Sequence, residues 1–324
     1  MNNQETIKNL LVLYRCETPL HIGSGNEMGV VDLPIQREKH TGFPKMEASG
    51  LKGGFRAFFE RQNSEKVNTF FGSENESEDA KAGGLIFTDG RLLLFPVRAG
   101  IDVFRWITCP YVLQRFSREL ERYGKNNEAE YIDAILKEID YKQLNKGTVY
   151  QITKGKAKQN EKQTEDKSIT LGHFSFGNEK LAIEQDKNFI SIVERVCNKD
   201  NYLFQKMQKN IVLVSDELFS YFTEMNTQID TRICIGDNGV VKDGGLFTEE
   251  SLPEESILYS FIDEWKTKEK KENYSEVENF CSEVTEKNLQ WLQLGGDITI
   301  GKGIVQIEFY GIKDNNGNSN IEIE

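Results

Sequence analysis

Apolar residues in this chain of 324 residues fall in short runs, and this feature restricts the possible folds more than any other. The longest runs are Leu10–Tyr14, Leu92–Phe95 and Ile211–Val214. Each has the length of a buried strand and lies far below the roughly 18 residues that cross a membrane. Because heptads and internal repeats are also absent, the sequence indicates one elaborated domain or two ordinary ones, and no integral membrane protein.

The N-terminal residues do not have the pattern of a signal peptide. Glu5 stands early, and the first apolar run is shorter than the roughly 7 to 15 residues of a signal-peptide core. We therefore expect a cytoplasmic protein without a membrane partner. The cysteines are scattered singly, which favours reduced thiols over disulfides or a zinc site. They are Cys16, Cys109, Cys197, Cys234 and Cys281.

The N-terminal third alternates between regular elements and glycine-rich segments. A strand is predicted over Leu10–Cys16, and no regular element is expected in residues 17–44. A helix follows, and the polar segment Asn63–Lys81 is predicted to be an exposed loop. Two strands are then expected to form a hairpin at Thr88-Asp89-Gly90. The predicted helix presents these apolar residues on one side: Leu51, Phe55, Phe58 and Phe59.

The middle of the chain is predicted to be largely helical. Amphipathic patterns cover Gln114–Tyr123 and Glu128–Ile139, and the lysine-rich residues 153–168 are expected to form a mobile loop. After the strand Ile211–Val214, Ser215 has the properties of a helix N-cap.

The C-terminal third contains the clearest hairpin signal. Asp237-Asn238-Gly239 separates Arg232–Ile235 from Val240–Lys242, and two glycines at 244 and 245 predict a bulge on the return strand. A helix is predicted over Ser275–Leu292. A glycine-rich turn and a strand over Ile304–Tyr310 follow.

The formal net charge of −12 argues against an obvious nucleic-acid binder, but the charge is unevenly distributed. Residues 249–286 contain twelve acidic residues against four lysines, which gives −8 from this segment alone. Residues 142–167 contain seven lysines against three acids, which gives +4. Residues 37–56 are also rich in lysine and arginine. A basic surface on one side of the molecule is therefore compatible with the acidic total.

The run from Gly296 to Lys302 is similar to a phosphate-binding P-loop but fails in two respects. Gly303 stands where a Ser or Thr would bind magnesium, and the following residues alternate as a strand instead of forming a helix. Nucleotide hydrolysis is therefore rejected. Glycines that expose backbone amides beside Lys302 would still suit any phosphate backbone, although a purely structural connection is equally compatible. These glycines are Gly295, Gly296, Gly301 and Gly303.

Candidate catalytic residues lie in the irregular segment after the first strand. Asp32 is flanked by His21 and His40. Two histidines with a lysine are able to cleave RNA by acid-base catalysis without a metal, although a single histidine near a strand end is more often structural. From composition alone, Asp32 is a turn or cap residue.

Six motifs, in this order, are similar to one known family. They are LHIGSGNEMGVVDLPIQREKHTGFP, SGLKGGFR, GRLLLFPV, WITCP, TRICIGDNGVVKDGGLFTEESLP and WLQLGGDITIGKG. The chain resembles the RAMP superfamily and, within it, the repeated backbone subunit of the type III-B CRISPR (Cmr) effector complexes. The first and last motifs are specific to this subunit, and the resemblance spans nearly the whole chain.

The resemblance implies an α+β fold, namely a ferredoxin-like (RRM-like) palm with helical insertions and a β-hairpin thumb in a single domain, 1–324. The palm would take residues 1–100, 205–225 and 255–324. The helical insertion would take about 101–204, and the thumb about 228–252.

The resemblance also implies an endoribonuclease. The chain would bind crRNA, single-stranded target RNA, further copies of itself in a filament and other subunits of the complex. Asp32 falls at the family's catalytic position and would hold a weakly bound Mg²⁺ or Mn²⁺ ion while guide-paired target is cut at six-nucleotide intervals. Glu249 or Glu250, after the hairpin, would supply a second carboxylate or would lie on the solvated surface, and His21 is a further catalytic candidate. The alternatives are a non-catalytic RNA scaffold and the metal-independent histidine mechanism. The RNA-binding residues would be Arg37, Lys39, His40, Lys52, Arg56, Arg232, Gly295, Gly296, Gly301, Lys302 and Gly303.

Overall fold

The computed structural model describes residues 9–25, 29–73, 81–154, 168–183, 188–197, 201–237, 239–265 and 275–310. Its strands are β1 (Asn9–Cys16), β2 (Lys45–Met46), β3 (Leu85–Phe87), β4 (Gly90–Arg98), β5 (Phe104–Thr108), β6 (Thr148–Lys154), β7 (Ser168–Leu171), β8 (Phe174–Ile183), β9 (Ile211–Leu213), β10 (Gln228–Ile235), β11 (Val241–Ser251), β12 (Ile257–Glu264), β13 (Trp291–Gln293) and β14 (Ile304–Tyr310). Its α-helices are α1 (Ala48–Arg61), α2 (Val67–Phe71), α3 (Pro110–Arg122), α4 (Asn126–Lys137), α5 (Tyr141–Leu144), α6 (Phe189–Val193), α7 (Asn201–Met207), α8 (Asp216–Met225) and α9 (Glu276–Glu286). Two 3₁₀ turns are η1 (Glu194–Cys197) and η2 (Ile298–Ile300).

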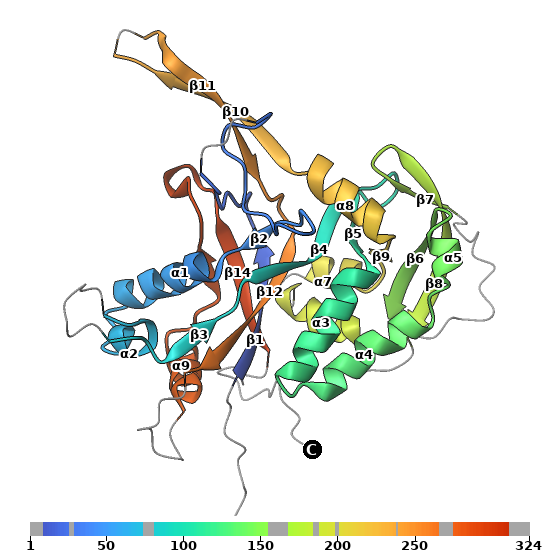
Figure 1. Ribbon diagram of the computed structural model, residues 1–324, viewed down its shortest axis with the longest axis horizontal. Coiled ribbons are helices and arrows are strands. Elements are labelled where there is room, and N and C mark those ends of the chain that lie inside the picture. Colours follow the sequence, from blue (N-terminus) through green and yellow to red (C-terminus); the bar gives the residue numbers. More distant parts are fainter. Residues whose placement is uncertain are drawn as a thin grey trace, which may run out of the picture.

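The main sheet has the order β13-β14-β1-β12-β4-β5-β9-β6-β8-β7 within the described residues. In the palm, formed by β14, β1, β12 and β4, each strand is antiparallel to its neighbours. Strands β5 and β9 pair in parallel and extend the sheet into the second half of the molecule. Figure 1 shows α1, α2 and α9 to one side of the palm strands and α3 and α4 to the other. The fold is therefore the mixed α+β class that the resemblance implied.

The palm strands are buried on both faces. On one side, Phe55 of α1 packs against Phe280 of α9 at a centroid distance of 5.8 Å. On the other side, Phe116 of α3 packs against Tyr259 of β12 at 4.5 Å. Strands covered on both faces need apolar residues at successive positions, which explains the unbroken apolar run in β1.

Three predictions of secondary structure were wrong. The polar segment Asn63–Lys81 contains the short helix α2, because Phe70 and Phe71 are buried against the palm helices. The strands β3 and β4 do not form a hairpin at Thr88-Asp89-Gly90; both pair with β12 and follow one another along it. The Asp-Gly pair marks an interruption between two consecutive strands.

The third wrong prediction concerns the helix expected over Ser275–Leu292. The helix α9 ends at Glu286, and Asn288 adopts a left-handed conformation with φ of 50°. Asparagine tolerates this conformation better than most residues. The chain then turns into β13, which pairs with β14.

Other predictions were confirmed, including β1, α1, the Ser215 N-cap of α8 and the strand β14. The region predicted as a helical insertion, residues 101–204, contains the strands β5 to β8 as well as helices. Most of the predicted mobile loop, residues 155–167, lies outside the described residues. No described helix is long and apolar enough to cross a membrane.

Candidate nucleic-acid interface

The hairpin arm, formed by β10 and β11, projects from the body of the molecule (Figure 1). Within the described residues its strands form a two-stranded sheet separate from the main one. The predicted bulge is present: pairing jumps from Ile233↔Leu246 to Ile235↔Val241, and Gly244 there has a φ of 67°. The hairpin prediction is confirmed.

One face of the hairpin arm is apolar and exposed. Opposite residues of an antiparallel pair project from the same face, so Ile233 and Leu246 share a face with Thr231 and Thr248. Ile233 is 57% exposed and Leu246 is 64% exposed. A projecting arm with apolar side chains is typical of a surface that contacts a partner. The exposed apolar residues of the arm are Ile229, Ile233, Ile235, Val240, Val241 and Leu246.

Asp32 lies at the base of this arm, against Thr248. Its Oδ2 atom accepts hydrogen bonds from the Thr248 amide at 2.7 Å and the Thr248 hydroxyl at 2.8 Å. Leu33 continues the contact by a parallel bridge to Glu249. The hydrogen bonds from Thr248 hold the pKa of Asp32 below its usual range, so the exposed side chain is a carboxylate at neutral pH.

Glu250 is buried and serves the local structure. Its Oε1 atom accepts from the guanidinium of Arg37 at 2.5 Å and from the hydroxyl of Thr227 at 2.8 Å, and its Oε2 atom accepts from the amide of Ile35 at 3.0 Å. Both oxygens therefore attach the 35–37 segment to the hairpin arm. The expectation that Glu250 is either a second catalytic carboxylate or solvated surface is not supported by this geometry.

Glu249 belongs to a partly buried group that we call the clamp cluster: Asp230, Arg232, Glu249, Asp297 and Lys302. The Lys302 ammonium is 2.5 Å from Glu249 and 2.9 Å from Asp230, while Arg232 contacts Asp297 at 3.0 Å. Only 7% of Lys302 is exposed. The sequence prediction that Lys302 contacts phosphate is corrected here, because its ammonium points inward to carboxylates. Glu249 is likewise no solvated surface acid.

The glycine loop, residues 294–303, docks on the segment after β1. The amide of Gly303 donates to the carbonyl of Pro19, and the amide of Gly296 donates to the carbonyl of His21, each at 2.9 Å. The amide of Gly301 donates within the loop, to Ile298. The prediction that these glycines expose free amides is therefore wrong for Gly296, Gly301 and Gly303.

The glycines are needed for close approach. A Cβ atom on Gly303 would lie 1.9 Å from the carbonyl oxygen of Leu294, and one on Gly295 would lie 2.2 Å from that of His21. Both residues also have positive φ angles, 79° and 73°. Any other residue at these positions would force the loop away from the body.

The two histidines contact different elements. The Nδ1 atom of His21 lies 2.6 Å from the carbonyl oxygen of Glu250, next to the glycine loop. The exposed His40 lies 3.1 Å from the hydroxyl of Tyr111 on α3. The structure thus brings neither ring into hydrogen-bond contact with Asp32, and a catalytic histidine pair has no support in the geometry.

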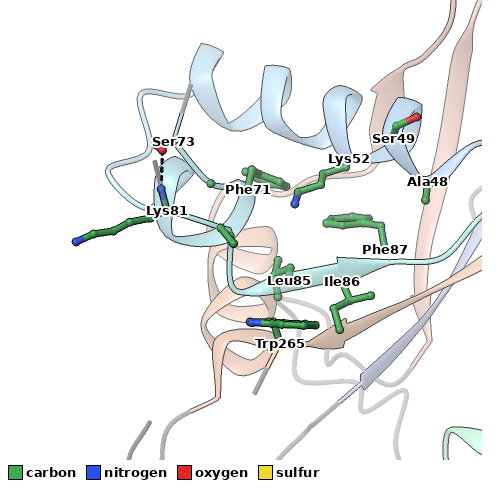
Figure 2. Close-up of a pocket in the computed structure, with 13 residues that line it drawn as sticks. Ala48, Ser49, Lys52, Phe71, Ser73, Lys81, Leu85, Ile86, Phe87 and Trp265 are labelled. Atoms are coloured by element: carbon green, nitrogen blue, oxygen red, sulfur yellow. Dashed lines mark hydrogen bonds between the residues drawn. The ribbon is translucent and has the colours of Figure 1, made fainter. Parts of the chain in front are cut away.

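The predicted RNA-binding cations differ in their availability. Arg37 and Arg232 are turned toward carboxylates, and Arg56 donates to Glu60 and to the carbonyl of Gly72. Lys39 is exposed. Within the described residues Lys52 makes no ion pair, and it points into a pocket of about 570 Å³ (Figure 2).

The pocket around Lys52 is lined by two lysines, Lys52 and Lys81, and by aromatic side chains. Figure 2 shows the Lys52 ammonium beside Phe71 and Phe87, and Trp265, which directly follows β12, also lines the pocket. Burial, and to a lesser extent the charge of Arg56, lowers the pKa of Lys52. A partly desolvated cation without a counter-ion favours an anionic ligand such as a phosphate.

Within the described residues, the surroundings of Asp32 offer one exposed carboxylate and no protein cage for a metal ion. The described residues contain no group of three or more His, Cys, Asp or Glu side chains that could hold a metal ion. Mg²⁺ commonly keeps several waters and binds one or two carboxylates together with substrate phosphates. Asp32, being exposed and ionised, is suitable as the carboxylate of such a site.

Comparison with known proteins defines the class. A model of the RAMP superfamily matches residues 13–306, so the chain belongs to that superfamily. The CRISPR system Cmr endoribonuclease Cmr4 of Pyrococcus furiosus is 34% identical over 307 residues, which are 93% of this chain and 95% of that protein. The CMR subunit Cmr4 of Saccharolobus solfataricus is 24% identical over 306 residues. Within the superfamily the chain therefore belongs with the Cmr4 subunits, and the resemblance is confirmed.

Solved structures agree with this assignment. The crystal structure of oligomeric Cmr4 from Pyrococcus furiosus superposes with a TM-score of 0.64 at 28% identity and covers 94% of this chain and 98% of its own. A chain of the type III-B Cmr-beta complex bound to cognate target RNA superposes with a TM-score of 0.71 at 23% identity, with the same coverage. At that identity the second match supports the fold alone.

Sequence patterns did not indicate Thr248 and Asp230, two residues that organise the site. Thr248 lies 216 positions after Asp32, and Asp230 lies 72 positions before Lys302. Hydrogen bonds over such separations leave no local pattern in a sequence. Only the strand register of the hairpin could have indicated that Asp230 and Glu249 are opposite one another.

Proposed function

We propose that the chain is a crRNA-binding backbone subunit of a cytoplasmic type III-B CRISPR complex, and that it cleaves guide-paired target RNA at six-nucleotide intervals. The observation that carries the proposal is the position of Asp32, an exposed carboxylate bonded to the base of a projecting apolar arm. The similar Cmr4 of Pyrococcus furiosus is named an endoribonuclease, and a similar complex has been solved with cognate target RNA.

The hairpin arm would supply the geometry of cleavage. Apolar side chains that enter between base steps unstack them and bend the strand. A regular A-form helix holds the 2′-oxygen of each ribose out of line with the adjacent phosphorus, so cleavage requires one nucleotide to leave the stack. Ile233 and Leu246 on the apolar face would enter the guide-target duplex, and the displaced target nucleotide would reach the base of the arm.

Asp32 would then act on the 2′-hydroxyl. The carboxylate accepts the hydroxyl proton, the 2′-oxygen forms a bond to phosphorus, and the bond to the 5′-oxygen of the next nucleotide breaks. Water protonates that oxygen, which leaves a 2′,3′-cyclic phosphate and a 5′-hydroxyl. General-base catalysis of this kind contributes about 10²- to 10⁴-fold. A divalent cation bound beside Asp32 would supply charge stabilisation at the phosphate.

The guide strand would contact the body of the subunit. Lys52 and Lys39 are the predicted cations whose ammonium groups are available, and copies of the chain would stack along the guide with other subunits of the complex. Sequence would be read by guide pairing, because contacts to the backbone carry no sequence information. A non-catalytic scaffold remains the alternative, since no second acid or base is hydrogen-bonded to Asp32 in the described residues.

Analysis of the product ends tests the proposal. The complex reconstituted with this chain should cut a guide-matched, end-labelled RNA to products with 2′,3′-cyclic phosphate and 5′-hydroxyl ends, and leave an unmatched RNA intact. EDTA should stop the reaction and excess Mg²⁺ or Mn²⁺ should restore it. Products with 5′-phosphate ends would contradict attack by the 2′-hydroxyl, and unchanged cutting in EDTA would contradict a role for the metal.

A further inference from the structure

Lys302 connects the glycine loop to both strands of the hairpin arm. Its ammonium donates to Asp230 on β10, and to Glu249 and Ser251 on β11, at 2.9, 2.5 and 3.0 Å. An ammonium group has three protons, so these contacts use its full donor capacity. The Lys302 side chain is therefore directed at the root of the arm, where the two strands leave the body.

The other members of the clamp cluster place further carboxyl groups and a second cation around Lys302. Burial, together with a hydrogen bond to Glu249, raises the pKa of Asp297. The carboxyl groups of Asp230, Glu249 and Asp297 face the cations Lys302 and Arg232. Removing one cation would leave a buried carboxylate without its counter-charge.

The cluster is one of several contacts that orient the arm. Within the described residues, β10 and β11 form no ladder with the main sheet, and the pairing Leu33↔Glu249 is an isolated bridge. The segment 32–37 also holds the arm root, through hydrogen bonds with Thr248 and Glu250. The glycine loop is held on the body through the amides of Gly296 and Gly303, and Lys302 joins this loop to the arm root.

The same cluster is adjacent to Asp32. Glu249, which Lys302 binds, directly follows Thr248, whose amide and hydroxyl hold the Asp32 carboxylate. A rotation of the arm root would move Thr248 and Asp32 together. The position of the Asp32 carboxylate relative to the glycine loop is therefore set by three consecutive links. Lys302 binds Glu249, Glu249 directly follows Thr248 in the chain, and Thr248 binds Asp32.

We propose that Lys302 is a positioning residue, which clamps the root of the hairpin arm to the glycine loop and so places Asp32 for cleavage without touching RNA itself. The inference rests on the proposed function. It assigns a mechanical role to the lysine of the glycine loop, in place of a phosphate contact. It also makes Glu249 a hydrogen-bond acceptor of Lys302 instead of a catalytic acid.

The test compares Lys302→Met with Lys206→Met in the assembled complex. Lys206 is a matched control, because it is 8% exposed and lies on α7, where its ammonium sits 4.6 Å from the ring centroid of Phe104. We expect Lys302→Met to lower the single-turnover cleavage rate at saturating target by at least tenfold and to change target affinity less than twofold. Hydrogen exchange of the Thr248 amide should rise in the same variant. Lys206→Met should leave all three quantities unchanged.

A second variant keeps the test decisive if Lys302→Met assembles poorly. The double change Glu249→Gln with Lys302→Met removes one charge of each sign and should restore assembly and a large part of the cleavage rate. Wild-type cleavage by Lys302→Met, or equal loss of guide binding and cleavage, would overturn the inference. Failure of both variants to assemble would also overturn it, because the cluster would then be a folding element.

The result for the role of Lys302 is distinguishable from the result for the proposed function. If the wild-type complex cleaves and Asp32→Asn does not, the function stands whatever Lys302→Met does. If the wild-type complex does not cleave, the function fails, and the exchange of the Thr248 amide still reports whether Lys302 fixes the arm.

Discussion

Asp32→Asn should slow cleavage of guide-paired target by about 10²- to 10⁴-fold, the contribution of a lost general base, while target binding stays within a factor of about two. Asparagine keeps the size of the side chain and is able to accept the hydrogen bonds from Thr248. It loses the negative charge that accepts the proton and attracts the cation. A single-turnover time course on end-labelled RNA, with the variant in every backbone position, measures the effect.

Asp237→Asn provides the matched control for this experiment. Asp237 is an exposed acid at the tip of the same hairpin arm, so its substitution removes an equal charge from the arm without touching the root. Its cleavage rate should equal that of the wild type. Full-rate cleavage by Asp32→Asn would remove Asp32 from the chemistry, and a loss of activity in His21→Ala would then favour a histidine mechanism.

Shortening the hairpin arm should abolish the regular spacing of the cuts. Deletion of Ile235–Lys242 removes the tip with its exposed apolar residues Ile235, Val240 and Val241, and leaves the clamp cluster in place. The palm should fold as before, because in the described residues the strands of the arm do not pair with the strands of the main sheet. Gel analysis of the products should show the six-nucleotide ladder replaced by weak or irregular cuts.

A milder variant separates the effect of the apolar side chains from the effect of the length of the arm. Ile233→Thr combined with Leu246→Thr places a β-branched residue suited to a strand at both positions and removes most of the apolar surface from one face. We expect the ladder to fade while the length of the arm is preserved. An unchanged ladder in both variants would show that the arm is not the wedge.

The parts of the fold that the sequence predicted well are those determined by local chemistry. The run in β1 is apolar at successive positions because both faces of the palm are covered, and this pattern is readable without a structure. The hairpin and its bulge follow from glycines that accept left-handed backbone angles, as Gly244 does. The Ser215 cap likewise depends on a hydrogen bond to the nearby amide of Leu218.

The errors come from contacts between distant segments. The Asp-Gly pair before β4 predicted a hairpin, yet β12, far along the chain, takes both β3 and β4 as successive partners. Lys302 was assigned to RNA because a lysine among glycines is typical of a phosphate site. Its carboxylate partners on β10 and β11 lie more than 50 positions away.

Asp32 shows most clearly what local sequence is unable to predict. From its neighbours alone it was a turn or cap residue, and only the resemblance to the RAMP family singled it out. The structure adds the physical basis: a carboxylate kept ionised by Thr248 and attached to the hairpin arm. No local pattern in residues 29–37 predicts that attachment.

The most direct test of the account is a titration of wild-type chain against Asp32→Asn during assembly of the complex. If each copy makes its own cut, the initial rate at every position of the ladder should fall in proportion to the fraction of Asp32→Asn, while target binding stays constant. A ladder whose rates do not depend on that fraction would contradict the account, because another subunit would then cleave the target.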